Sequence, residues 1–149
     1  MGQGRLVTAS CTTGWLDWIH GELWLFPDGL LRSSTGLKTT WAHGREKARR
    51  DHDRARGRAG GVVQTVTGEP RSREFADGEI ERIVASRRRN LWIEADRIKR
   101  ADLHVGRTTS RINLHMTDGR RIKLLWLRED RAERPLTTAL SSWGVATGP

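Results

Sequence analysis

Residues 91–127 read LWIEADRIKRADLHVGRTTSRINLHMTDGRRIKLLWL. Apolar and polar residues alternate along this stretch, which is typical of strands that bury one face. In residues 111–117 the alternation places Ile112, Leu114 and Met116 inward. Asn113 and His115 then point outward. The stretch therefore predicts antiparallel strands that contribute one face to a hydrophobic core.

Turn signals divide this stretch into a meander. Thr117-Asp118-Gly119 predicts a tight turn, after which residues 120–127 return as a strand. In residues 98–105, alternation puts Leu103 and Val105 on one face. Such signals recur every 8–12 residues or so in sandwiches and barrels. We expect His104 and His115 to share the outer face of one hairpin.

Residues 21–34, GELWLFPDGLLRSS, predict a β-hairpin. Two apolar runs flank Pro27-Asp28-Gly29, in which proline presets φ, aspartate tolerates a turn and glycine supplies a positive φ. Trp24 belongs to one of these runs, so we expect it in the core. Shorter β-like runs predict further strands in residues 5–10, 37–42 and 62–67.

Residues 77–88 predict an internal helix. Ile80, Ile83 and Val84 recur at helical spacing, and Asp77 is a candidate N-cap. Three arginines, residues 87–89, are expected at its C-terminal end, where positive charge suits the helix dipole.

The chain ends in a second predicted helix. Its apolar face comprises Leu136, Ala139, Leu140 and Trp143. Pro135 suits the first turn, and Gly144 can end the helix. An alternative start is Asp130, with Glu133 completing a capping box.

The order of these elements resembles bacterial pleckstrin-homology-like (PH-like) domains of the actinobacterial type. In residues 91–127, Ile93, Ile98 and Leu103 fill apolar positions five residues apart, and Asp118-Gly119 supplies the turn of the outer hairpin. Residues 21–32 are similar to the early hairpin of that group. The resemblance implies a mainly β (β with α) fold class: a PH-like β-barrel or sandwich of about seven strands. It also implies one internal helix and a C-terminal amphipathic helix that plugs the barrel with Trp143 buried.

The 149 residues suffice for one domain, 1–149, within which residues 44–76 predict a charged insertion or long loop. No apolar run approaches the ~18 residues of a membrane-spanning helix. No N-terminal stretch fits a secretory signal. The single cysteine, Cys11, excludes an internal disulfide and a multi-cysteine zinc site. We therefore expect a cytoplasmic location, with peripheral attachment to the inner face of the membrane as an option.

Net charge is +9, and most of the 27 basic residues are arginines. Arginine pairs bidentately with phosphate and carboxylate, which favours nucleic acid or lipid headgroups as partners. A GC-rich genome would produce the same arginine-rich composition without any such function. The basic residues concentrate in residues 45–60 and 87–89.

The preferred hypothesis is a non-enzymatic binding or scaffold module that contacts an anionic partner, either a protein or the inner membrane surface. The alternative is a nucleic-acid-binding protein that uses the same arginines. Both hypotheses use the same candidate contact residues, which are Arg45, Lys47, Arg49, Arg50, Arg54, Arg56, Arg58, Arg87, Arg88 and Arg89.

A small-molecule-binding or catalytic barrel is the third hypothesis, and it requires Cys11, His20 and an acid to converge. We expect no catalytic residues, because a lone cysteine is usually a small buried hydrophobe. We also expect no cofactor and no metal. Asp51-His52-Asp53 and the preceding His43 are metal-capable, but the surrounding arginines repel cations.

Overall fold

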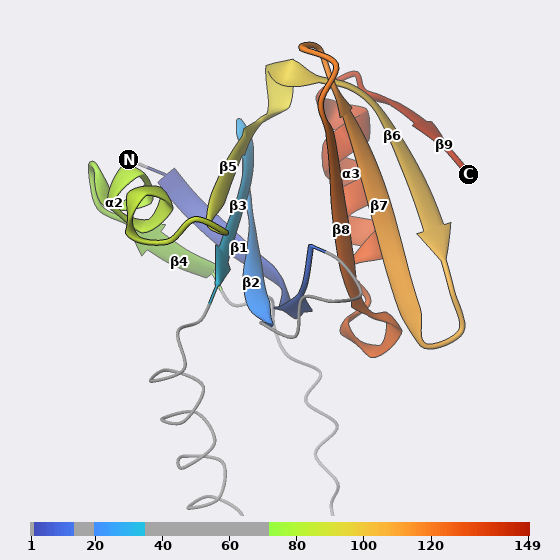
Figure 1. The fold of residues 1–149 in the computed structure, drawn as a ribbon, viewed down its shortest axis with the longest axis horizontal. Coiled ribbons are helices and arrows are strands. Elements are labelled where there is room, and N and C mark those ends of the chain that lie inside the picture. Colours follow the sequence, from blue (N-terminus) through green and yellow to red (C-terminus); the bar gives the residue numbers. More distant parts are fainter. Residues whose placement is uncertain (1, 14–19, 35–71) are drawn as a thin grey trace, which may run out of the picture. The chain divides into compact units, whose positions relative to one another are not determined.

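A computed structural model describes residues 2–13, 20–34 and 72–149 (Figure 1). In this part of the chain, strands dominate and two α-helices accompany them. The strands are β1 (Gly2–Cys11), β2 (Gly21–Phe26), β3 (Gly29–Ser34), β4 (Ser72–Phe75), β5 (Leu91–Glu94), β6 (Ile98–Val105), β7 (Thr109–Met116), β8 (Arg121–Leu127) and β9 (Ala146–Gly148). The helices are α2 (Glu79–Ser86), α3 (Glu133–Ser142) and the short 3-10 turns η1 (Ala95–Arg97) and η2 (Arg128–Asp130).

The strands form two sheets. A five-stranded sheet has the order β4-β1-β2-β3-β5, and a four-stranded sheet has the order β8-β7-β6-β9. All pairs are antiparallel except β6 with β9. The chain passes from one sheet to the other through η1, and a bridge between Thr12 and Leu125 joins them elsewhere. The predicted mainly β class is confirmed, as are the internal and C-terminal helices. The described residues form nine strands rather than about seven, and these strands do not form a closed barrel.

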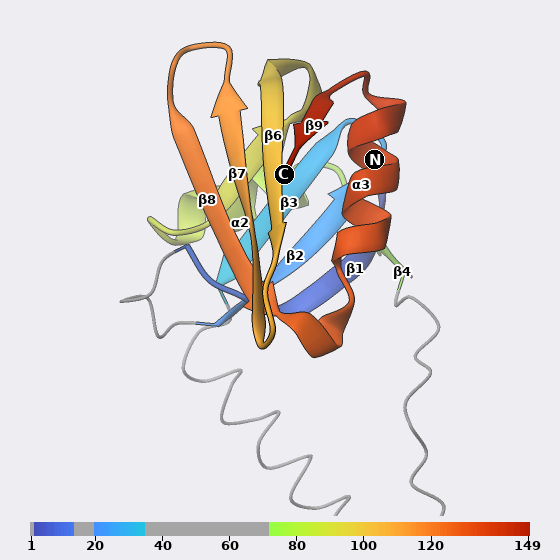
Figure 2. The same cartoon turned by 90° about the vertical axis from the view of Figure 1, so that its right-hand side faces the viewer.

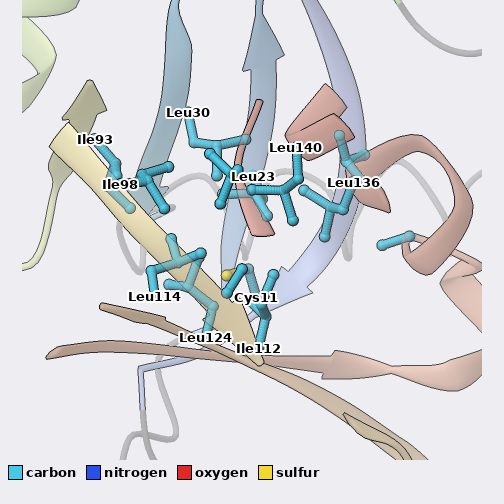
Figure 3. Close-up of a cluster of buried hydrophobic side chains, with 14 of the residues drawn as sticks. Cys11, Leu23, Leu30, Ile93, Ile98, Ile112, Leu114, Leu124, Leu136 and Leu140 are labelled. Atoms are coloured by element: carbon cyan, nitrogen blue, oxygen red, sulfur yellow. The ribbon is translucent and has the colours of Figure 1, made fainter. Parts of the chain in front are cut away.

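The main hydrophobic core lies between the two sheets (Figure 3). The inward residues predicted for β7 are all buried. The helix α3 lies beside the sheets (Figure 2) and adds Leu136 and Leu140 to this core. Cys11 is fully buried in the same cluster. The predicted alternation therefore gives the correct inward face for β7, whereas in β6 Leu103 is partly buried and Val105 is exposed.

A second apolar cluster covers the opposite face of the five-stranded sheet. It contains Trp24, Phe26, Leu31 and Phe75. The apolar side of α2 packs against it through Ile80, Ile83 and Val84. Because this sheet is buried on both faces, its middle strand β2, GELWLF, is nearly a continuous apolar run.

The predicted hairpin of residues 21–34 is confirmed, but the role given to Gly29 was wrong. Phe26 pairs with Gly29, so Pro27 and Asp28 alone form the turn. Gly29 has no positive φ. A Cβ atom there would lie 2.5 Å from the carbonyl oxygen of Ile93, so the position requires glycine for close strand approach.

The helix ends also correct the sequence analysis. Gly78 (φ 72°) precedes α2, and no side chain caps it in the way proposed for Asp77. Ala132 precedes α3, so the alternative capping box from Asp130 is wrong. Gly144 (φ 70°) follows α3 as predicted. Trp143 is half-buried, and its indole Nε1 donates to the carbonyl oxygen of Pro27 at 2.7 Å.

Other predictions lie outside the described residues. They include the strands in residues 37–42 and 62–67 and most of the charged insertion, residues 44–76. The described end of that insertion contains β4, which pairs with β1.

Candidate functional site

Polar side chains line the outer face of the four-stranded sheet in register across β6, β7 and β8. Residues directly opposite in an antiparallel pair project to the same face. The strand pairing therefore aligns three rows. These rows are Arg100–His115–Arg121, Asp102–Asn113–Lys123 and His104–Arg111–Leu125. We call the polar members of these rows the basic face.

The outward direction of the basic face follows from the core. Ile112 and Leu114 alternate with Arg111 and Asn113 along β7, and both apolar residues are fully buried. None of the described helices packs over the basic face, which faces the viewer in Figure 2. His104, like the arginines of the basic face, is exposed. These side chains are therefore accessible to a partner.

Asp102 is the single carboxylate of the basic face. Its Oδ1 accepts a hydrogen bond from Nε of Arg100 at 2.8 Å, and its Oδ2 lies 2.7 Å from Nε2 of His115. The hydrogen bond from Arg100, followed by that from His115, lowers the pKa of Asp102. The same contact with Asp102 raises the pKa of Arg100. Arg100 and Asp102 therefore largely neutralise each other.

The remaining cations of the basic face are Arg111, Arg121 and Lys123. Within the described ranges, none of the three forms an ion pair or side-chain hydrogen bond. They lie on adjacent strands, since Asn113, between Arg111 and His115, pairs with Lys123. The result is an uncompensated positive surface suited to an anionic partner.

The arginines predicted after the internal helix lie elsewhere. Arg87, Arg88 and Arg89 are exposed residues that follow α2. Arg87 is the C-cap residue of α2, so the predicted position of these arginines at the C-terminal end of the helix is confirmed, although the last helical turn itself contains no basic residue. The carbonyl oxygen of Arg89 accepts a hydrogen bond from Nη1 of the buried Arg32. The other candidates, Arg45, Lys47, Arg49, Arg50, Arg54, Arg56 and Arg58, lie outside the described residues.

The catalytic alternative depended on Cys11 and His20. Cys11 is fully buried among apolar side chains, whereas His20 is exposed. Among the residues that the structure describes, no group of three His, Cys, Asp or Glu side chains could hold a metal ion. His104 and His115 do share the outer face, but they pair with Arg111 and Arg100 rather than with each other.

The sequence analysis missed the basic face even though it placed Asn113 and His115 outward. Arg111, Asn113 and His115 occupy every second position, so the alternation that places Asn113 and His115 outward also places Arg111 outward. The same spacing links Arg121 to Lys123. The contiguous basic runs in residues 45–60 and 87–89 are more conspicuous in the sequence than this alternation.

Comparison with protein-family models, curated proteins and solved structures found no match for this chain. None of the helices in the described ranges is long and apolar enough to cross a membrane.

Proposed function

We propose that this chain is a non-enzymatic PH-like binding module that contacts an anionic membrane surface through the basic face. The observation that carries the proposal is the presence of three cations, Arg111, Arg121 and Lys123, on one exposed sheet face, where they have no anionic partner among the described residues. The PH-like assignment is supported by the order of the elements: an early hairpin, a three-stranded meander and a C-terminal helix.

Electrostatics supports a membrane as the partner. Each basic residue close to an anionic leaflet contributes about 1 kcal/mol to binding, and the sum needs no enclosed ligand pocket. A sheet face presents its cations together, so several can reach one surface at once. Single-stranded nucleic acid is usually bound by aromatic side chains on which bases stack. The basic face contains no tryptophan, tyrosine or phenylalanine, and this composition favours the membrane over that alternative.

The test is co-sedimentation with phosphatidylcholine vesicles, with and without phosphatidylserine, at about 150 mM salt. We expect binding to the anionic vesicles only. A triple variant, Arg111→Gln, Arg121→Gln and Lys123→Gln, should bind about 100-fold more weakly, from about fivefold for each lost charge. Circular dichroism would verify that the variant remains folded.

A matched control removes the same charge from another surface. Arg82→Gln, Arg87→Gln and Arg88→Gln together change exposed residues on and after α2. The proposal predicts a much smaller loss for this control than for the basic-face variant. Equal losses would show that binding follows net charge rather than the basic face. Duplex DNA that displaces the protein from vesicles would favour a nucleic-acid partner instead.

A further inference from the structure

A pocket of about 770 Å³ lies at one end of the four-stranded sheet. The β6–β7 turn contributes Arg107, and the segment after β8 contributes Arg128 and Arg131. The β6–β7 turn and the end of β8 lie at the same end of this sheet (Figure 1). We call this site the arginine pocket. Three arginines therefore line one concave surface, and Nη1 of Arg128 donates to the carbonyl oxygen of Gly106 at 3.4 Å.

Hydrogen bonds fix the walls of the arginine pocket. The carboxylate of Asp130, in η2, accepts hydrogen bonds from the hydroxyls of Thr8 and Ser10 in β1. The backbone N–H of Leu127 also donates to Oγ of Ser10, at 3.0 Å. Arg128 N–H donates to the carbonyl oxygen of Thr108 at 3.0 Å. The segment that carries two of the three arginines is thus held to both β1 and the β6–β7 turn.

The charges of the arginine pocket are only partly compensated. In the described part of the chain, Arg107 and Arg131 form no ion pair or side-chain hydrogen bond. Two carboxylates also line the pocket. That of Glu133 accepts hydrogen bonds from the Ser110 hydroxyl and the Trp126 indole, both of which are uncharged donors, whereas Glu129 is exposed. Three arginines against two carboxylates leave the pocket with a net positive charge.

Apolar side chains accompany the arginines. Val105 is 51% exposed and Leu127 is 39% exposed. Within the described residues they are the two large apolar side chains that are exposed, and both line the arginine pocket. Exposed apolar side chains would contribute little to the binding of a soluble phosphate compound. The bilayer interface accepts both apolar side chains and cations, because acyl chains lie just below the phosphate groups.

We propose that the arginine pocket binds the phosphate of a phospholipid headgroup while Val105 and Leu127 enter the bilayer interface. The inference rests on the proposed membrane-binding function but uses residues outside the basic face. Arginine supplies bidentate hydrogen bonds that match phosphate geometry. Val105 and Leu127 make the predicted binding specific for phosphate at a membrane surface rather than for phosphate in solution.

The test uses the full chain and the same phosphatidylserine-containing vesicles. Arg107→Gln with Arg131→Gly should weaken binding about 25-fold, at about fivefold for each arginine. Glycine suits position 131, where the backbone has φ 51°, so this variant should fold. Val105→Thr with Leu127→Thr should weaken binding about 10-fold or more through lost apolar burial. Glu129→Gln should strengthen binding, since it removes the exposed one of the two carboxylates that line the pocket.

The source of the phosphate is distinguished with a soluble headgroup. Glycerophosphoserine, added at the same concentration as the lipid phosphate, should leave vesicle binding unchanged. Displacement by it would overturn the membrane-surface site, as would full binding by the Val105→Thr, Leu127→Thr variant. Vesicle binding that survives both arginine substitutions but disappears in the basic-face triple variant would overturn this inference and leave the proposed function standing. Absence of vesicle binding by the wild-type protein would overturn both.

Discussion

The outer faces of the two sheets differ in their composition and in whether a helix covers them. The outer face of the five-stranded sheet is aromatic and covered by α2, whereas that of the four-stranded sheet is charged and uncovered by the described elements. Both sheets turn their inner faces to the same core. The covered face buries apolar area, which stabilises the fold. The basic face buries little, so its composition is free to serve binding.

Substitutions on the two outer faces should therefore have different effects on folding and on binding. Substitutions on the covered face should change the free energy of unfolding and have little direct effect on binding to anionic vesicles. Substitutions on the basic face should do the reverse. Three substitutions test the effect on stability, in order of decreasing effect: Phe75→Ala, Gly4→Ala and Asp102→Asn.

Phe75→Ala should cause the largest loss. The ring is fully buried and packs edge-to-face on Trp24 and Phe26, with centroids 5.2 and 5.1 Å apart. Removing it leaves a cavity beneath α2, so we expect a loss of about 3–5 kcal/mol in the free energy of unfolding. Urea denaturation followed by tryptophan fluorescence would measure it. Phe75→Leu is the control and should lose much less, whereas a loss near zero for alanine would mean that α2 does not seal this face.

Gly4→Ala should cause an intermediate loss. A Cβ atom on Gly4 would lie 2.7 Å from ring carbons of both Phe26 and Phe75. Overpacking of this kind costs about 1–3 kcal/mol. The same denaturation experiment measures the effect. In a Phe26→Leu background, where one of the two rings is gone, the added methyl group should cost less; an unchanged cost would contradict the steric explanation.

Strands that bury one face show alternation, and strands that bury both faces show continuous apolar runs. Both patterns are local, so much of this fold could be predicted from the sequence. The short strands β4 and β9 escaped prediction, since neither has more than one buried residue. The capping box at Asp130 failed for a tertiary reason. Its carboxylate accepts hydrogen bonds from Thr8 and Ser10, which are more than 100 positions away in sequence. Local propensity cannot anticipate a partner at that distance.

The candidate site was harder to predict than the fold. Arg111 and Lys123 become neighbours on one face only through the register of β7 with β8. A run such as residues 87–89 attracts notice in a sequence because its charges are contiguous. A binding face instead combines alternate residues from several strands, so it emerges only when the strands are aligned.

The smallest predicted effect on the free energy of unfolding comes from Asp102 on the basic face. This effect changes with pH in the acid range. Arg100 and then His115 lower the pKa of Asp102, which stabilises the folded state when the carboxylate is charged. This contribution is fully present above the ordinary pKa of 3.8 and disappears as the pH falls through the lower folded-state pKa. Asp102→Asn should therefore be slightly less stable than wild type near neutral pH, and the difference should shrink with acidification.

Urea denaturation of both proteins at a series of pH values would measure this difference. His115→Gln provides the matched background, because it removes the second contact and leaves Arg100 in place. If Arg100 has the larger influence, as its hydrogen bond to Asp102 indicates, most of the pH-dependent difference should persist in that background. A difference that stays constant with pH would show that the ion pair on the basic face does not stabilise the fold. In that case the two outer faces would differ even more sharply than the structure indicates.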